Sequence, residues 1–304
     1  MSDPLTELVG QREAKSPDGN PLGTLVTRET DIILVTAPKT GTTWLQQILH
    51  QLRMPSPPHM DFDDIIQVVP WPHLTQQIGL DTNAEQLGEP RCFKSHQRLA
   101  AVWRGARYIA VVRDPVSVIE SWWAFNSEKK HPSTLTGTID DFVEHPIVME
   151  EMLFGANIWD YYNEFWICRN VPQILFLVFE DMVKDLRGTL PKIAAFMGLV
   201  RDDAFLDTVA EASSKQFMMA HSEKFDESWL SAQMQKHGKI FYNGSLVNNK
   251  KNDRLSQESR DFLDQVWMEK IGAETGLNTY KEFANCFREG AALSASTTSS
   301  DIKK

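Results

Sequence analysis

The segment Asp31-Ile-Ile-Leu-Val-Thr-Ala-Pro-Lys-Thr-Gly-Thr-Thr-Trp44 decides the expected fold, because it joins a buried strand to a helix through a glycine turn. Residues 31–36 are rich in β-branched side chains around the apolar run 32–35, which is typical of a strand buried on both faces, and a helix is predicted over 42–53. Gly41 lets the turn adopt backbone conformations closed to other residues, and the N–H groups at the helix start favour an anion. Lys39 adds a positive charge and three threonines add hydroxyl donors, so the segment predicts a phosphate-binding loop.

Short apolar runs alternate with helical patterns along the rest of the chain. The apolar runs predict further strands at 91–94, 107–112 and 173–178. Helices are predicted from Pro115, a favoured first helical residue, and at 148–168, 181–197, 202–211 and 256–271. Strands that alternate with helices predict a parallel sheet covered on both faces. The expected fold class is α/β: a single domain with a central parallel sheet flanked by helices and a P-loop-like nucleotide-binding core.

Composition limits the possible functions. The 304 residues carry 31 Lys and Arg against 41 Asp and Glu, a net charge of −10. Nucleic-acid-binding proteins are usually basic, so no nucleic acid partner is expected, and an anionic ligand must be held by a local cluster of cations. The most apolar run, 174–179, is far shorter than the roughly 20 residues of a membrane helix. Three scattered cysteines (Cys92, Cys168 and Cys286) indicate a reducing, intracellular context with buried thiols. We therefore expect a cytoplasmic protein without a membrane partner.

The chain divides into three parts by composition. Residues 1–30 are polar and rich in proline and glycine, which favours an extended N-terminal arm. Residues 31–288 contain no linker, repeat or change of composition and are expected to form one domain. Residues 289–304 are mostly alanine, serine and threonine, which predicts a disordered tail.

A second anion-binding segment is expected at Val111-Val112-Arg113-Asp114-Pro115, which ends a buried strand and starts a helix. An arginine at the carboxyl end of a strand lies where doubly wound sheets bind ligands, and its planar guanidinium suits a phosphate. Arg-Asp-Pro alone is also a common strand–helix turn. Its occurrence roughly 70 residues after the first loop, in the same structural setting, favours the functional interpretation.

The candidate base is His96, in Phe93-Lys94-Ser95-His96 after a short strand. Imidazole can remove a proton from an acceptor at neutral pH. By itself His96 is also compatible with a packing histidine, and Lys94 with a solvated lysine. The two anion-binding segments favour a catalytic role for both. No histidine pairs with another at i, i+4, so no metal site is expected.

Residues Pro38-Lys39-Thr40-Gly41-Thr42-Thr43-Trp44 resemble the 5′-phosphosulfate loop of the cytosolic sulfotransferase family, usually PKSGTTW. Arg113 to Ser121 resembles the 3′-phosphate motif RDPxxxxxS of that family, and Lys94-Ser95-His96 resembles its Lys-Ser-His segment. The family transfers a sulfonyl group from 3′-phosphoadenosine 5′-phosphosulfate (PAPS), leaving adenosine 3′,5′-bisphosphate (PAP), without a metal ion. The resemblance therefore implies a sulfotransferase domain over 31–288 with PAPS as co-substrate.

The resemblance also implies a role for each matching residue. His96 would be the general base, with Lys94 beside the transferred group and Lys39 at the leaving 5′-phosphate oxygen. Arg113 and Ser121 would bind the 3′-phosphate. The 5′-phosphate would be held by Thr40, Gly41, Thr42 and Thr43. Trp44 would stack on adenine.

Two segments depart from the family pattern around the nucleoside. Phe179 replaces the tyrosine of the family's Tyr-Glu-Asp-Met, which removes any hydroxyl contact to adenine from that position. In the 212–218 segment, Ser213 is the implied adenosine ligand. Lys215 stands there where an aromatic residue is usual, so Trp44 is expected to hold adenine mainly by itself.

The C-terminal departures are larger. The family's RKGxxGxW segment has no clean copy, and its charge would come from Lys250, Lys251 or Arg254, unless 248–254 is only a solvated loop. Lys250 is the first candidate. The family's C-terminal dimer motif is also missing after Arg254. The dimer of animal members is therefore not expected, and the oligomeric state is left open.

The acceptor pocket is expected in the loops 55–90 and 123–155. Their aromatic residues favour an aromatic-lined cavity for a small molecule, although each ring is equally compatible with ordinary core. Acidic residues near these loops favour a cationic acceptor over an anionic one, with a solvated acidic loop as the alternative. These acidic residues are Asp61, Asp63, Asp64 and Glu120.

Two other functions remain as alternatives. A P-loop-type small-molecule kinase predicts a lysine directly after the last glycine of the loop, and Thr42 stands there instead. A non-catalytic, nucleotide-binding member of the family predicts loss of the base or of the loop lysine. Both His96 and Lys39 are present, which favours an enzyme.

Overall fold

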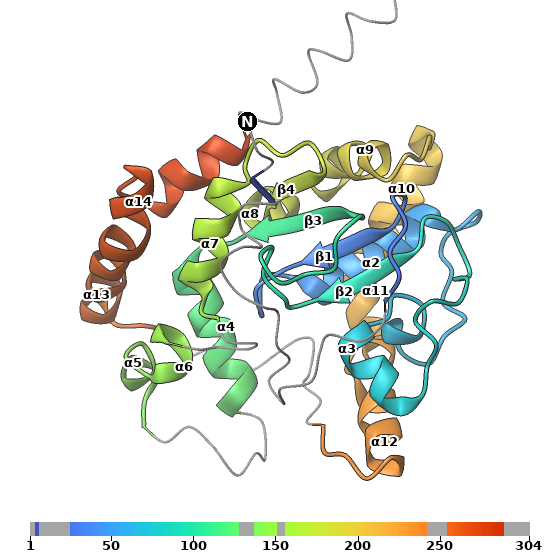
Figure 1. The fold of residues 1–304 in the computed structure, drawn as a ribbon, viewed down its shortest axis with the longest axis horizontal. Helices are drawn as coiled ribbons and strands as arrows, with labels where there is room; N and C mark the ends of the chain where they lie inside the picture. Colours follow the sequence, from blue (N-terminus) through green and yellow to red (C-terminus); the bar gives the residue numbers. More distant parts are fainter. Residues whose placement is uncertain (1–3, 6–24, 128–136, 151–155, 242–253, 289–304) are drawn as a thin grey trace, which may run out of the picture.

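The computed structural model describes residues 4–5, 25–127, 137–150, 156–241 and 254–288 (Figure 1). Four strands form one parallel sheet in the order β2-β1-β3-β4. They are β1 (Ile32–Val35), β2 (Cys92–Ser95), β3 (Arg107–Val112) and β4 (Ile174–Val178). All four predicted strands are confirmed, within one residue at most ends. The register places Val35 beside Ser95 and Ala110, so the segments that follow β1, β2 and β3 meet at one edge of the sheet.

One face of the sheet is covered by three helices: α2 (Thr42–Arg53), α9 (Leu186–Phe196) and α10 (Asp203–Ala212). Strand side chains alternate between the faces, and Ile32 and Leu34 of β1 point to this one. They pack with apolar residues of the helices, all of them buried: Leu45, Ile48 and Leu49 of α2, Leu190 and Ile193 of α9, and Leu206 and Val209 of α10. The bounds of α2 are those predicted, 42–53. The prediction works because the apolar residues of this helix recur at helical spacing on the side that meets the sheet.

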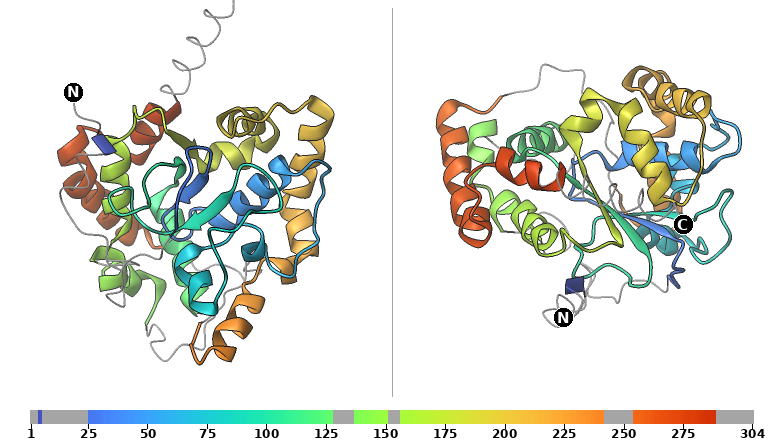
Figure 2. Two further views of the ribbon diagram at one scale, coloured as in Figure 1. Left: turned by 45° about the vertical axis from the view of Figure 1, so that its right-hand side comes forward. Right: turned by 90° about the horizontal axis from the view of Figure 1, so that it is seen from above.

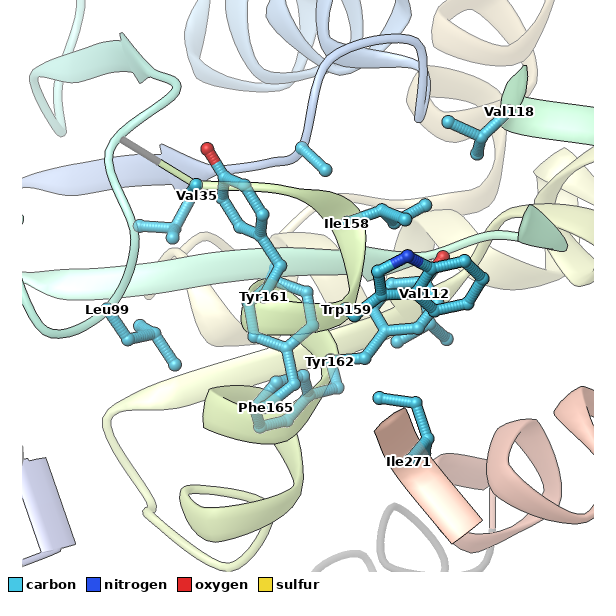
Figure 3. Packing of buried hydrophobic residues seen from close by; sticks show 14 of the residues in the cluster. Val35, Leu99, Val112, Val118, Ile158, Trp159, Tyr161, Tyr162, Phe165 and Ile271 are labelled. Atoms are coloured by element: carbon cyan, nitrogen blue, oxygen red, sulfur yellow. The ribbon is translucent and has the colours of Figure 1, made fainter. Parts of the chain in front are cut away.

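The opposite face is covered by α4 (Pro115–Ser127), α7 (Ile158–Ile167) and α13 (Gln257–Trp267). Ile33 and Val35 of β1 point to this side. The rings of Trp159 and Tyr162 on α7 pack against Trp267 of α13, and Figure 3 shows both on the side of Ile271, whereas Tyr161 points toward Val35. Seen from above in Figure 2, the sheet lies between the C-terminal helices (orange to red) and the gold helices of the other face. The predicted α/β fold with both faces covered is confirmed.

The remaining elements are mostly short. They are η1 (Ile65–Gln67), α3 (Pro72–Thr75), η2 (Gln76–Ile78), α5 (Ile139–Phe142), α6 (Pro146–Met149), α8 (Phe179–Lys184), α11 (Lys215–Ala220), η3 (Ser222–Lys224), α12 (Ser228–Lys236), η4 (Met268–Gly272) and α14 (Ala273–Thr275), with a last helix at 280–288. The single helix predicted over 181–197 is two helices, α8 and α9. They separate at Asp185, whose carboxylate accepts the Gly188 N–H at 2.8 Å and so starts a new helix.

A buried ion pair joins the amino ends of β1 and β2. The Arg91 guanidinium donates to both carboxylate oxygens of Asp31, at 2.9 and 2.6 Å, and both side chains are almost fully buried. Arg91 also donates to the carbonyls of Val26 and Asn83. These bonds satisfy two charges that would otherwise be destabilising in the interior.

The termini are described only in part. Leu5 and Leu25 are buried against the larger core cluster, and residues 1–3 and 6–24 of the predicted arm, like the tail 289–304, lie outside the described residues. Cys92 and Cys168 are buried as expected, whereas Cys286 is half-buried. No helix among the described residues is both long and apolar enough to cross a bilayer.

Candidate active site

The phosphate loop turns sharply because two of its residues have left-handed backbone, Lys39 at φ 66° and Gly41 at φ 99°. Inside the loop, the Thr40 hydroxyl donates to the Ala37 carbonyl at 2.7 Å, and the hydroxyls of Thr36 and Thr42 share a hydrogen bond at 2.8 Å. Thr40 and Thr42 therefore shape the loop, and their hydroxyls are engaged within it. Gly41 occupies the N-cap of α2 without a side chain, and the first turn holds no acidic residue. The first N–H groups of a 12-residue helix thus face the loop, an arrangement that favours an anion.

Phe179, the first residue of α8, joins the two predicted anion-binding segments. Its ring packs so closely on Gly41 that a Cβ there would lie 2.8 Å from the Phe179 Cε2 atom. The guanidinium of Arg113 lies over the same ring, 4.2 Å from its centroid, and Trp44 meets it edge-on at 5.8 Å. Arg113 also donates from Nη1 to the Lys39 carbonyl. The structure therefore brings Arg113 against the phosphate loop, as the sequence predicts.

Arg113 is held from several sides. The Tyr162 hydroxyl donates to the Arg113 carbonyl and accepts its N–H. Burial lowers the pKa of Arg113 from its usual value, because desolvation disfavours the charged form. Its Nε is buried and has no hydrogen-bond partner among the described residues. Asp114 accepts the Val116 N–H at 3.1 Å and so caps α4, and Ser121 follows on the same helix, half-buried.

Trp44 and Ser213 lie together although they are far apart in sequence. The Trp44 indole N–H donates to the Ser213 carbonyl at 2.7 Å. Ser213 is fully buried, and its hydroxyl has no hydrogen-bond partner among the described residues. Lys215 is exposed at the first turn of α11. The structure thus brings Trp44 and Ser213 together, beside the ring of Phe179.

His96 follows β2 and points toward the phosphate loop. Its Nδ1 donates to the Thr36 carbonyl at 2.8 Å, which leaves the lone pair of a neutral imidazole on Nε2. The Tyr161 hydroxyl donates to the His96 carbonyl, and the ring meets Trp71 edge-on at 4.9 Å. Burial, reinforced by the positive charge of Lys94, lowers the pKa of His96 to about 3. The imidazole is therefore neutral at physiological pH.

Lys94 and His96 contact the same indole. The Lys94 ammonium lies 4.5 Å from the Trp71 ring centroid and 2.7 Å from a carboxylate oxygen of Glu227. Lys94 is thus a buried, paired cation, and not a solvated lysine. The Lys39 ammonium lies 4.1 Å from the Phe125 ring centroid. Both catalytic lysine candidates are held against aromatic faces, which attract cations electrostatically.

The predicted acidic rim is wrong for two of its four members. Asp64 is fully buried and caps η1 by accepting the Ile66 N–H at 3.1 Å. Burial raises the pKa of Asp64 to about 6. Glu120 is also buried, and it accepts hydrogen bonds from Arg254 and Arg260. Local sequence does not reveal these partners, because both arginines come from a segment more than 130 residues away. Asp61 and Asp63 are exposed, as expected.

The C-terminal cation candidates are only partly described. Lys250 and Lys251 lie outside the described residues. Arg254 is described, and its Nη1 donates to Glu120, the neighbour of Ser121 in sequence. Most of the Arg254 side chain, 69%, remains exposed.

The residues present fit a doubly phosphorylated adenosine at this edge of the sheet. The loop around Gly41 offers helix N–H groups to one phosphate, and Arg113 keeps an unpaired buried Nε for a second. The unpaired Ser213 hydroxyl beside Trp44 fits the nucleoside between them. No group of three or more potential metal ligands occurs among the described residues.

The sheet, the phosphate loop after β1 and the arginine after β3 define a nucleotide-binding α/β protein with a candidate base beside the phosphate loop. A family model described as "Sulfotransferase domain" matches residues 29–275. The chain therefore belongs to the sulfotransferase family. The predicted resemblance is confirmed.

Curated relatives agree with this assignment. The chain is 29% identical to mouse (Mus musculus) Sulfotransferase 4A1 over 193 residues, which are 60% of this chain and 65% of that protein. The match thus spans less than two thirds of that relative. The chain is also 27% identical to rat (Rattus norvegicus) Sulfotransferase 2A6 over 258 residues, which are 81% of this chain and 86% of that protein.

Solved structures have the same fold. A mouse sulfotransferase, SULT7A1, complexed with PAP, matches with a TM-score of 0.59 and 20% identity, covering 93% of both chains. A retinol dehydratase in complex with androsterone and the inactive cofactor PAP matches with a TM-score of 0.56 and 16% identity, covering 83% of this chain and 81% of that one. At these identities the similarity concerns the fold.

The sequence does not predict the positions that several other residues occupy in the site. Glu227 pairs with Lys94 across 133 residues of sequence, and no local pattern reveals such a contact. As an aromatic residue of the loop 55–90, Trp71 is predicted only to line the acceptor pocket, but it contacts both Lys94 and His96. Tyr161 and Tyr162 lie at successive positions of α7, where helical spacing signals only burial.

Proposed function

We propose that this protein is a PAPS-dependent sulfotransferase that moves a sulfonyl group to a hydroxyl or amine of a small-molecule acceptor. The single observation that carries the proposal is the bond from His96 Nδ1 to the Thr36 carbonyl at the start of the phosphate loop. It turns the lone pair of Nε2 away from that carbonyl and fixes a neutral base beside the place where a phosphate would bind.

The nucleotide would be held at its two ends. The N–H groups of α2 with Thr43 and Lys39 suit the 5′-phosphate, and Arg113 with Ser121 suits the 3′-phosphate. Trp44 and the Ser213 hydroxyl suit adenine and its ribose. The Phe179 ring, in contact with Gly41, Arg113 and Trp44, sets the spacing between these groups.

PAPS supplies an activated sulfonyl group on a good leaving phosphate. Such transfers depend on positioning and on electrostatic stabilisation of shifting charge. Lys39 offsets negative charge on the departing 5′-phosphate oxygen, and Lys94 steadies the transferred group. His96 receives the acceptor proton on Nε2. Its low pKa keeps it unprotonated and ready, and a polyanion bound nearby favours the imidazolium that forms.

The acceptor is proposed to enter beside Trp71 and Phe62, which are buried aromatic residues of the loop 55–90. An aromatic or cationic small molecule remains the proposed class. We also propose that the protein acts in the cytoplasm, that 1–30 forms an arm over the domain 31–288, and that a C-terminal cation among Lys250, Lys251 and Arg254 reaches the 3′-phosphate.

The test combines binding and transfer. Calorimetry with PAP and, separately, Mg·ATP should show tight binding of PAP alone, since a P-loop kinase would prefer Mg·ATP. Radiolabelled transfer from PAPS to 4-nitrophenol, 2-naphthol and 2-naphthylamine should give product with at least one acceptor. His96→Ala should abolish transfer and leave the PAP affinity within about twofold, because His96 acts in the chemical step and not in nucleotide binding.

The outcomes separate the alternatives. Binding of Mg·ATP in preference to PAP would overturn the proposal in favour of a kinase. PAP binding without transfer to any of the three acceptors, and without hydrolysis of PAPS, would favour a non-catalytic member. Full transfer by the His96→Ala variant would remove His96 from the role of base.

A further inference from the structure

Glu227 forms an ion pair with Lys94, although the two residues come from different parts of the chain. Glu227 immediately precedes α12, whereas Lys94 belongs to β2. The two charged groups are 2.7 Å apart and their side chains are 5% and 16% exposed. A desolvated ammonium without such a partner would be strongly unfavourable. Glu227 therefore stabilises Lys94 in the position that it occupies.

The position of that ammonium is narrowly defined. A lysine side chain is flexible and places its charge poorly on its own. Here the carboxylate of Glu227 holds it from one side, and the face of Trp71 lies 4.5 Å away. The same indole contacts His96 edge-on. Lys94 and the base are therefore placed relative to each other through one ring and one carboxylate.

The backbone at Glu227 points to the same role. Its φ of 60° is left-handed, which is unfavourable for a residue other than glycine, asparagine or aspartate. Such strain persists where the surrounding structure requires it. The Glu227 carbonyl accepts the Ser231 N–H at 3.0 Å and begins α12, and Leu230 of α12 packs in the same apolar cluster as Trp71. The helix start and the ion pair thus depend on one strained residue.

We propose that Glu227 is a positioning residue for sulfonyl transfer, which fixes the Lys94 ammonium beside the transferred group without touching the substrate. The inference rests on the proposed function. It assigns to the start of α12, which carries none of the proposed nucleotide-binding residues, an influence on the chemical step that acts through Lys94. Two other titratable groups face the pair. Asp64, the N-cap residue of η1, feels the charges of Glu227 and Lys94, and His96 feels those of both and of Lys39 in the phosphate loop.

The test is a double-mutant cycle on the rate of transfer. Glu227→Gln keeps the shape of the side chain and removes its charge, and Glu227→Asn also tolerates left-handed backbone. Both should lower kcat by about tenfold or more, the scale of a lost charged contact, with the PAP affinity unchanged within about twofold. In the Lys94→Met background, the same substitutions should change the rate by less than about twofold, because the residue through which Glu227 acts is gone.

kcat is measured from steady-state transfer of a radiolabelled sulfonyl group to whichever of the three panel acceptors the wild type uses fastest, and single-turnover reactions give the rate of the transfer step itself, including for slow variants. The matched control is Glu223→Gln, an exposed carboxylate in η3, which should leave kcat unchanged. An equal loss from Glu227→Gln with and without Lys94 would overturn the inference, as would an unchanged kcat in both Glu227 variants. A wild-type protein without any transfer would instead contradict the proposed function.

Discussion

Replacement of Gly41 by alanine tests the contact that joins the phosphate loop to Phe179. Two penalties are expected. Left-handed backbone at φ 99° is unfavourable for alanine by about 1–2 kcal/mol. The new Cβ would also lie 2.8 Å from Phe179 Cε2 and 3.0 Å from Cδ2, and overpacking of this kind costs about 1–3 kcal/mol. Together the Gly41→Ala variant should lose about 2–5 kcal/mol of unfolding free energy.

Gly276 supplies a matched control. Its φ is also left-handed, at 74°, but no atom lies within 4 Å of a Cβ placed there. Gly276→Ala should therefore lose only the backbone penalty of about 1–2 kcal/mol. The difference in unfolding free energy between the two variants therefore measures the contact with Phe179. This difference should disappear in the Phe179→Ala background, where the ring is absent.

Urea unfolding followed by circular dichroism measures these differences. Calorimetry adds the functional consequence: Gly41→Ala should weaken PAP binding, because the ring of Phe179 can move only by disturbing Arg113 and Trp44. The reasoning fails if Gly41→Ala is no less stable than Gly276→Ala, or if the Phe179→Ala background leaves the difference between them intact.

Three other predictions concern charge. Burial raises the pKa of Asp64 to about 6, so its ionisation destabilises the fold increasingly from about pH 4 to pH 6 and constantly above. Asp64→Asn should therefore raise the Tm more at pH 8 than at pH 4, and an equal change at both would contradict this. The pKa of His96, lowered to about 3 by burial, predicts that kcat/KM shows no acidic limb between pH 5.5 and 7.5. A limb near pH 6.5 would show an exposed imidazole. Arg91→Met leaves Asp31 buried and unpaired and should cost about 3–5 kcal/mol in urea unfolding, whereas a loss below about 1 kcal/mol would mean that water reaches the pair.

The strands and the phosphate loop could be predicted because their signals are local. Residues 32–35 are continuously apolar, and a parallel strand buried on both faces needs that composition. Gly41 and the helix after it then follow from turn and capping chemistry. The same holds for Arg113 and Pro115, where a strand end and a helix start occur within three residues.

The charged contacts could not be predicted, because their partners are distant in sequence. Glu120 looks like an exposed acid in a one-dimensional pattern, yet it is buried and paired with arginines that the fold brings to it, and Asp64 is buried with one of its carboxylate oxygens unpaired among the described residues. Glu227 is the clearest case, since nothing near it indicates a lysine in β2. The single helix predicted over 181–197 is wrong for a different reason: the side chain of Asp185 caps a new helix and so divides an otherwise continuous helical pattern.

The hydrogen bond between His96 and the Thr36 carbonyl has a consequence for how such an enzyme changes its substrates. The distance between the His96 imidazole and the phosphate loop is set by the pairing of two neighbouring strands, β1 and β2. The long connections that would recognise the acceptor lie outside this strand pairing, although Trp71 of the connection 55–90 contacts Lys94 and His96. Insertions or substitutions in these connections can therefore change the acceptor specificity while the strand pairing keeps the reacting atoms aligned.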